Sequence, residues 1–231
     1  MLLSDGILRA DALSAQPVIH GFTTRTLGNL GFGKNPGDPE VKGNRERLFQ
    51  HPEFAGRMHI QPKQVHSDRA VGALDFYSGY EADAAYSRDP EHVLSVLTAD
   101  CLPILLYFPP GFVAAIHAGW RGLYHDIIPK TLALLPQGGI AAIGPAIGSC
   151  CYEVGETLAA DFQNKFGKEV VDRSREKPHL DLIRVALQQL DACGVDEVEA
   201  AQICTRCHPD LFFSYRRDGS VGRQMSYIGL S

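Results

Sequence analysis

The chain has 231 residues, of which 45% are hydrophobic and 21% charged, and its formal net charge is −5 at pH 7. This composition is typical of a folded domain that buries a core without disulfide staples. The net negative charge argues against a general nucleic-acid-binding surface, and no apolar run approaches the roughly 20 residues that span a bilayer. The N-terminus lacks a basic segment followed by an apolar one, so we expect a cytoplasmic protein whose six cysteines are not disulfides.

The first part of the chain predicts short strands separated by loops. We expect strands at Val18 to Thr24, His59 to Val65 (ending at His66) and Glu81 to Tyr86, a glycine-rich loop from Gly28 to Gly43, and a helix capped by Asn44 and running to Phe49.

The stretch from Val93 to Leu123 predicts the centre of the fold. Its three apolar runs, Val93 to Leu97, Pro103 to Phe108 and Phe112 to Ile116, are typical of strands buried on both faces. Polar residues stand where the runs stop: Asp100 and Cys101 between the first two, and His117 after the third. Because buried strands deliver fixed side chains to the crevice beyond their ends, we expect Cys101 and His117 to meet in space.

The second half of the chain alternates helices and strands. We predict helices at Tyr124 to Leu135, Gly155 to Phe166 and Leu180 to Cys193, and strands at Ile140 to Ile143, Val198 to Ile203, Phe212 to Tyr215 and Gln224 to Ile228, the last two joined through an Asp218-Gly219 turn. This alternation indicates a single α/β or α+β domain over residues 1–231.

His66, Cys101 and His117 form a candidate metal set. Two imidazoles and a thiolate suit zinc or copper, and three protein ligands leave a fourth position open, as in catalytic sites. A zinc-bound water has its pKa lowered to about 7 and supplies hydroxide at neutral pH. The three residues are far apart in the sequence, so a buried thiol and two hydrogen-bonded histidines remain an alternative.

Residues next to this set offer further chemistry. Asp100 could orient a ligand, accept a proton or cap the following segment. Trp120, the only tryptophan, could stack on a ring or fill the core. Arg121 could hold a phosphate or carboxylate with two parallel hydrogen bonds, or pair with a surface acid.

Cys204, Cys207 and His208 match the c-type haem attachment pattern. Haem attachment needs export, for which the sequence shows no signal. A zinc ribbon would need a second closely spaced cysteine pair, and the adjacent Cys150 and Cys151 make a poor one. A redox pair is a further alternative. We expect a structural or substrate-lining role.

Several segments together resemble one family. They are Phe22-Thr23-Thr24-Arg25, Gln64-Val65-His66, Thr98-Ala99-Asp100-Cys101-Leu102-Pro103, His117-Ala118-Gly119-Trp120-Arg121-Gly122, Ile143-Gly144-Pro145-Ala146-Ile147-Gly148 and Phe213-Ser214-Tyr215-Arg216-Arg217. Over nearly its whole length the chain resembles the laccase-domain family, also named the polyphenol oxidase or peptidoglycan-editing factor family.

The resemblance implies a four-layer α/β/β/α sandwich with mixed sheets, related to Cys-His hydrolase-like domains. It implies one catalytic zinc held by His66, Cys101 and His117. It also implies phosphorolysis of adenosine, inosine, guanosine and methylthioadenosine, adenosine deamination, and a role in editing a peptidoglycan precursor. With a nucleoside and phosphate as substrates, Arg25 and Arg121 are candidates for holding phosphate, and Asp100 for proton transfer.

Three other functions stay open on the sequence. Older family names imply a copper-dependent polyphenol oxidase, although the nine histidines contain no His-x-His run. A metal-independent hydrolase would use Cys101 as nucleophile and His117 as base. A non-catalytic module would bind a cell-wall precursor or a division partner without turning it over.

Overall fold

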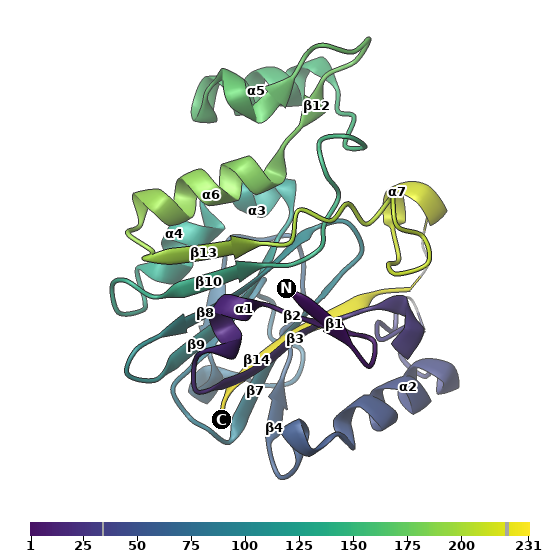
Figure 1. Ribbon diagram of the computed structural model, residues 1–231, viewed down its shortest axis with the longest axis vertical. Helices are drawn as coiled ribbons and strands as arrows, with labels where there is room; N and C mark the ends of the chain where they lie inside the picture. Colours follow the sequence, from purple (N-terminus) through teal and green to yellow (C-terminus); the bar gives the residue numbers. More distant parts are fainter. Residues whose placement is uncertain (34, 220–221) are drawn as a thin grey trace.

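The computed structural model describes residues 1–33, 35–219 and 222–231. Two six-stranded mixed sheets lie face to face between layers of helix (Figure 1). This arrangement confirms the predicted four-layer sandwich. Among the described residues, every helix is too short or too polar to traverse a bilayer.

The first sheet has the strand order β1-β2-β3-β14-β7-β4. Its neighbouring strands are antiparallel except for the parallel pair β4 and β7. The strands are β1 (Leu2–Ser4), β2 (Ile7–Arg9), β3 (Val18–Thr23), β14 (Gln224–Leu230), β7 (His92–Thr98) and β4 (Met58–Ile60).

The second sheet has the strand order β13-β10-β8-β9-β6-β5. Two of its pairs, β10 with β13 and β5 with β6, are parallel, and the pairs among β10, β8, β9 and β6 are antiparallel. The strands are β13 (Glu197–Ala200), β10 (Ile140–Ile143), β8 (Leu102–Phe108), β9 (Phe112–Ala118), β6 (Ala84–Ser87) and β5 (Ala70–Gly72). A small separate sheet pairs β11 (Val171–Asp172) with β12 (His179–Leu180).

The helices are arranged around the two large sheets (Figure 1). They are α1 (Asp11–Ser14), α2 (Pro39–Phe49), α3 (Trp120–Tyr124), α4 (Ile127–Leu132), α5 (Glu156–Phe166), α6 (Leu182–Ala192) and α7 (Tyr215–Asp218), with short 3-10 turns η1 (Arg25–Leu27), η2 (Pro52–Phe54), η3 (Ala73–Asp75) and η4 (Lys168–Val170). Helices α3, α4 and α6 lie beside the second sheet, and α2 lies below the first (Figure 1).

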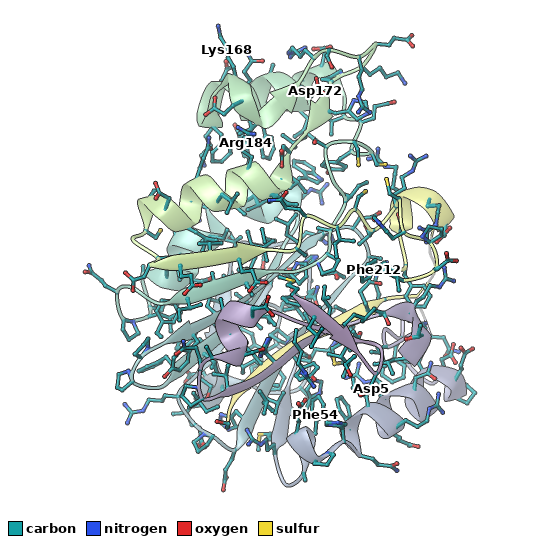
Figure 2. The ribbon with its side chains drawn as sticks, viewed as in Figure 1. Asp5, Phe54, Lys168, Asp172, Arg184 and Phe212 are labelled. Atoms are coloured by element: carbon teal, nitrogen blue, oxygen red, sulfur yellow. The ribbon has the colours of Figure 1, made fainter. Side chains whose placement is uncertain are left out.

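The core is divided among the layers by side-chain alternation. Along β8, Leu105 and Tyr107 pack in the cluster between the two sheets, whereas Ile104, Leu106 and Phe108 pack in the cluster under α3, α4 and α6. Because both faces of β8 are covered, its sequence is apolar throughout. The outer face of the first sheet packs on α2 and η2, where the Phe54 ring lies 4.9 Å from that of Tyr227 (Figure 2).

Several predicted boundaries are wrong for local reasons. Helix α2 begins at Pro39 under an Asp38 cap whose carboxylate accepts from Glu40 N–H, so Asn44 lies buried inside the helix instead of capping it. The helix expected from Tyr124 to Leu135 is shorter, because Tyr124 ends α3 and α4 begins only after Asp126, whose φ is +64°.

Three expected strands also differ. The strand starting near His59 ends at Ile60, and Asp83 immediately precedes β6 instead of lying within it. The segment at Phe212 forms no strand with β14; it leads into α7, whose Ser214 cap accepts from Arg217 N–H. Part of the predicted turn after Asp218-Gly219 lies outside the described residues.

Candidate metal centre

Three side chains from distant parts of the chain converge on one point. The candidate ligand atoms of His66, Cys101 and His117 all lie within 4.8 Å of one another. Cys101 Sγ is 3.9 Å from His66 Nε2, and the two imidazole rings stand nearly perpendicular with their centroids 4.9 Å apart. His117 is buried, Cys101 half-buried and His66 exposed, so the group is open to solvent on one side.

Cys101 lies between the first two central strands, as predicted, whereas His117 and His66 are positioned differently from the prediction. His117 lies inside β9, one residue before its end. Cys101 lies where the chain crosses from β7 in the first sheet to β8 in the second. His66 does not end a strand; it lies in a loop with a left-handed φ of +58°, which is uncommon for a residue other than glycine.

Asp83 organises this group, and sequence reasoning missed it. Its fully buried carboxylate accepts from His117 Nδ1 at 2.7 Å and from the backbone N–H groups of Val65, His66 and Ser67 at 3.2, 3.0 and 2.6 Å. It also accepts from the Ser67 hydroxyl at 2.7 Å. The available signal was a lone acid between the apolar residues Ala82 and Ala84, because a carboxylate in such a run must find donors.

This carboxylate fixes the tautomer of His117 and the backbone conformation of His66. Because an ionised carboxylate only accepts hydrogen bonds, His117 carries its proton on Nδ1 and turns Nε2 toward the other two side chains. The same carboxylate holds the backbone on both sides of His66 in its left-handed conformation. The donor set of two nitrogens and one sulfur therefore fits a zinc or copper ion, with protein-fixed ligands and one open side.

The three neighbouring charges shift one another's pKa values in the metal-free chain. Burial opposes the charged forms, but the adjacent His117 and the hydrogen bonds of both histidines lower the pKa of Cys101 to about 6. Against the same burial, the Cys101 thiolate and Asp83 raise the pKa of His117 to about 9. Burial would raise the pKa of Asp83, but the His117 and Ser67 contacts lower it to about 2. Cys101 is thus a thiolate at neutral pH, which is the form that binds metal.

Asp100 is held as an acceptor on both of its carboxylate oxygens. Thr205 Oγ1 donates to Oδ1 at 2.6 Å, and Arg216 N–H donates to Oδ2 at 2.7 Å. Its backbone φ is +94°, a strained value at the turn that presents Cys101. These contacts favour the orienting alternative over proton transfer for Asp100.

Gly119 lets the backbone run close to the candidate ligands. A Cβ atom at this position would lie 3.1 Å from His66 Cδ2 and 3.2 Å from Cys101 Sγ. The residue also starts α3, so this helix begins directly against the candidate metal centre.

The candidate substrate-binding residues make contacts with side chains and backbone other than the three candidate ligands. Trp120 is half-buried against the core under α3, and the exposed Arg121 guanidinium lies over its ring at 5.1 Å. Arg25 donates to the Pro209 carbonyl oxygen at 2.5 Å and stacks over Phe213, which ties it to the loop before α7. Arg121 is therefore the better placed of the two for a phosphate at the centre.

A second group of potential ligands comes together in the structure, which the sequence spacing did not indicate. The sulfurs of Cys150, Cys151, Cys204 and Cys207 lie within 4.8 Å of one another, although adjacent Cys150 and Cys151 make a poor pair by spacing. The fold supplies the convergence by placing the segment after β10 against the segment after β13.

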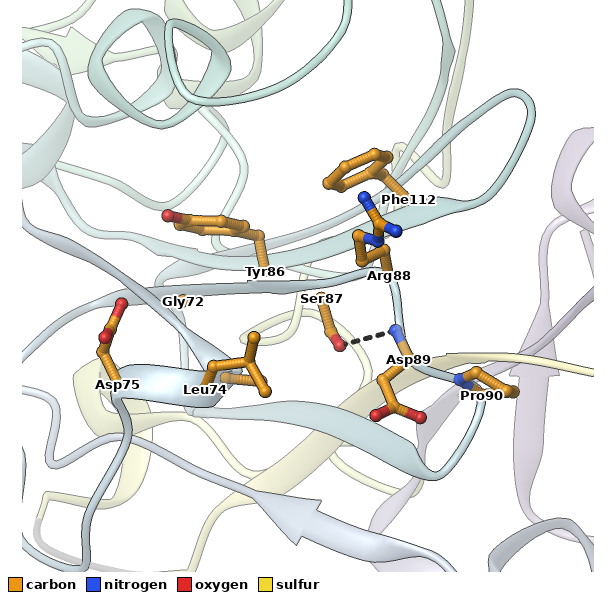
Figure 3. A pocket seen from close by; sticks show the side chains of 10 residues that line it. Gly72, Leu74, Asp75, Tyr86, Ser87, Arg88, Asp89, Pro90 and Phe112 are labelled. Carbon is orange, nitrogen blue, oxygen red and sulfur yellow. Dashed lines mark hydrogen bonds between the residues drawn. The ribbon is translucent and has the colours of Figure 1, made fainter.

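One cavity lies away from the candidate metal centre. It has a volume of about 630 Å³ and is lined by Tyr86, Arg88, Asp89 and Phe112 among others (Figure 3). Phe112 begins β9, whereas His117 lies near its other end, so this cavity and the three candidate ligands occupy opposite ends of that strand.

Known proteins resemble this chain over most of its length. The family model described as multi-copper polyphenol oxidoreductase laccase matches residues 13–231. Purine nucleoside phosphorylase YfiH of Shigella flexneri is 35% identical over 224 residues, covering 92% of this chain and 90% of that protein. A purine nucleoside phosphorylase of Bacteroides thetaiotaomicron is 40% identical over 257 residues, covering 96% and 95%.

Solved structures show the same fold. The crystal structure of YlmD from Geobacillus stearothermophilus aligns with a TM-score of 0.87 at 30% identity, covering 100% of this chain and 98% of that one. A Neisseria meningitidis protein aligns with a TM-score of 0.88 at 33% identity, covering 98% and 100%. The chain belongs to the family described as multi-copper polyphenol oxidoreductase laccase.

Proposed function

We propose that this protein is a zinc-dependent purine nucleoside phosphorylase whose metal is held by His66, Cys101 and His117. The observation that carries the proposal is the convergence of these three side chains under the Asp83 carboxylate. The names of the relatives supply the reaction class. The substrates implied by the family resemblance are adenosine, inosine, guanosine and methylthioadenosine.

The ion and the residues of the centre would have separate roles. A zinc ion at the centre would supply Lewis acidity to a group on its open side. His117 is held by β9, and Cys101 is held by the turn that leads into the neighbouring strand β8. Asp83 keeps the His117 proton on Nδ1. Because these positions are fixed before substrate arrives, little reorganisation accompanies the reaction.

In phosphorolysis a phosphate oxygen bonds to the sugar carbon while the carbon–nitrogen bond to the base breaks and the base leaves with the electron pair. Arg121, exposed beside the centre, is our candidate for holding the phosphate, since a guanidinium binds it with two parallel hydrogen bonds. Arg25 is a weaker candidate because its guanidinium already donates to Pro209. We include adenosine deamination and peptidoglycan-precursor editing in the proposal, as the resemblance implies, and Trp120 as a surface for the base.

The test combines metal analysis with a nucleoside assay on one sample. His66→Ala, Cys101→Ala and His117→Ala should each remove the zinc held at this centre and lower phosphorolysis by more than ~100-fold, because each removes a ligand itself. Cys193→Ser, at a half-buried cysteine outside both ligand groups, is the matched control and should leave both unchanged. Full phosphorolysis by metal-free protein would refute the proposal.

Two further functions have specific support. The family description and the His₂Cys donor set favour a copper oxidase, since copper binds such trigonal sites. Oxygen uptake with a phenol that requires stoichiometric copper would select it. The Cys101–His117–Asp83 chain also matches a cysteine hydrolase, with a thiolate nucleophile oriented by an imidazole. A covalent intermediate on Cys101 in metal-free protein would select that function.

A further inference from the structure

Four cysteines from two turns bring their sulfurs together on the surface beside the candidate metal centre. Cys150 and Cys151 lie in the turn after β10, in which the N–H of Cys151 donates to the Gly148 carbonyl at 2.9 Å. Cys204 and Cys207 lie in the segment after β13, in a turn closed by the N–H of Cys207 donating to the Cys204 carbonyl at 3.1 Å. All four are free thiols.

The sulfur separations match a tetrahedral ion site and not a disulfide. A zinc–sulfur bond of ~2.3 Å places two sulfurs of a tetrahedron about 3.8 Å apart. Cys207 Sγ lies 3.7 Å from Cys150 Sγ and 3.4 Å from Cys151 Sγ, and all four sulfurs lie within 4.8 Å of one another. A disulfide would require ~2.05 Å and would join only two of the four.

The surroundings of Cys151 favour an ionised thiolate. The Arg206 guanidinium donates to Cys151 Sγ at 3.5 Å and brings a positive charge to a group that would carry four negative ones. Gly148 leaves the space that the cluster occupies, since a Cβ there would lie 3.2 Å from Cys150 Sγ and 3.4 Å from Cys204 Cβ. Cys204 is buried while Cys150 and Cys207 are exposed, so an ion has an entry path.

The cluster lies where two segments continue the pairing of β10 with β13 beyond the sheet. Ala146 N–H donates to the Ile203 carbonyl at 3.2 Å, and Thr205 N–H donates to the Ala146 carbonyl at 2.9 Å. Thr205 also donates its hydroxyl to Asp100, which neighbours Cys101. An ion shared by the four sulfurs would therefore fix the segment from Cys204 to Cys207. Through Thr205 this segment contacts the turn that carries Cys101.

We propose that Cys150, Cys151, Cys204 and Cys207 bind a zinc ion in a closed, structural four-cysteine site, distinct from the centre formed by His66, Cys101 and His117. The two sites share no ligand. The closed site has four protein ligands and no open position, so its role is stability and not chemistry. The inference stands on the sulfur geometry alone and survives if the proposed function fails.

Counting zinc in the full-length protein tests the proposal. Wild type, purified under reducing conditions with zinc supplied, should contain two equivalents per chain. One equivalent of zinc should remain in the double variant Cys204→Ser/Cys207→Ser, and one in the double variant His66→Ala/Cys101→Ala. The control Cys193→Ser should retain two equivalents. Because a structural ion contributes folding free energy, the Cys204→Ser/Cys207→Ser variant should also melt at a lower temperature than Cys193→Ser.

A second pair of measurements uses zinc release from wild type and cobalt substitution of one variant. Titration of wild type with an organomercurial thiol reagent, read with a chromogenic zinc chelator, should release two equivalents of zinc. Cobalt substitution of the His66→Ala/Cys101→Ala variant should give the charge-transfer bands of tetrahedral thiolate coordination. One equivalent of zinc in wild type, lost in His66→Ala/Cys101→Ala and kept in Cys204→Ser/Cys207→Ser, would overturn the proposal. A Cys151–Cys207 disulfide in the protein as purified would overturn it equally.

Discussion

At the scale of single residues, one carboxylate accounts for the arrangement of the candidate metal centre. Asp83 satisfies one imidazole N–H, one hydroxyl and three consecutive backbone N–H groups while fully buried. A buried carboxylate with so many donors keeps its charge, and that charge in turn favours a proton on His117 Nδ1.

Replacing this carboxylate should weaken metal binding without removing any ligand. In Asp83→Asn an NH2 group replaces one carboxylate oxygen, either Oδ1, which accepts from His66 N–H and His117 Nδ1, or Oδ2, which accepts from Val65 and Ser67. In either position a donor faces donors, so the orientation of His66 and His117 is weakened. We expect zinc affinity at this centre to fall by about 10- to 100-fold, and stability by about 1–3 kcal/mol, measured by chelator competition and by denaturant unfolding. Glu81→Gln, an exposed carboxylate paired with Lys63, is the control. Unchanged affinity in Asp83→Asn would mean that Asp83 does not orient the ligands.

At the scale of elements, the candidate centre depends on a chain crossing between layers. Strand β7 belongs to the first sheet and β8 to the second, and only Ala99 to Cys101 connect them. The crossing turn is held by Asp100, whose carbonyl also accepts from Ile147 N–H at 2.9 Å. The next strand, β9, then returns antiparallel to β8 and places His117 opposite Pro103, beside the crossing.

The start of helix α3 provides a test at this scale. Gly119→Ala would push a methyl group to within 3.2 Å of both His66 and Cys101, so we expect weaker zinc binding and slower phosphorolysis in a protein that still folds. Gly155→Ala is a matched control, because Gly155 also precedes a helix and a Cβ there meets no atom within 4 Å. Any cost of alanine at a helix N-cap is shared by the two variants. Equal zinc affinities of Gly119→Ala and Gly155→Ala would show that the candidate centre tolerates the methyl group.

At the scale of the whole molecule, the first sheet holds two neutral histidines, the buried His20 and the half-buried His59. His20 Nε2 accepts from Ala10 N–H at 3.0 Å, and His59 Nε2 pairs with the Ser95 hydroxyl at 2.7 Å. Burial, with Arg9 nearby, lowers the pKa of His20 to about 4. Burial, with Arg45 nearby, lowers the pKa of His59 to about 3.

These shifts predict acid sensitivity of folding. Between the unfolded pKa of 6.5 and the folded pKa of about 4, the unfolded chain binds more protons at His20 than the folded one. Stability is therefore highest above pH 6.5 and falls as the pH drops through this window, by about 3 kcal/mol for His20 alone. His20→Gln keeps an acceptor for Ala10 N–H but cannot titrate, so its unfolding free energy should depend less on pH from 7 to 4. Identical pH profiles for both proteins, measured by urea unfolding, would contradict this assignment.

The sequence by itself determined the elements whose signal is local. The apolar runs predicted β7, β8 and β9 to within two residues, because strands covered on both faces leave no place for polar side chains. Glycines ended α5 and α6 as predicted, since Gly167 and Gly194 adopt positive φ. The candidate ligands His66, Cys101 and His117 were named from their residue types and their places beside apolar runs, and the family resemblance implied the same set.

Only the tertiary structure decided how these elements meet. Nothing local in Thr98 to Leu102 indicates that the chain changes sheets there, because the apolar runs on both sides look alike. The role of Asp83 depends on donors 16 to 34 positions away in the chain. The four-cysteine cluster likewise arises because two loops lie side by side after β10 and β13. Contacts of this kind are set by the packing of the two sheets, and residue spacing along the chain carries no record of that packing.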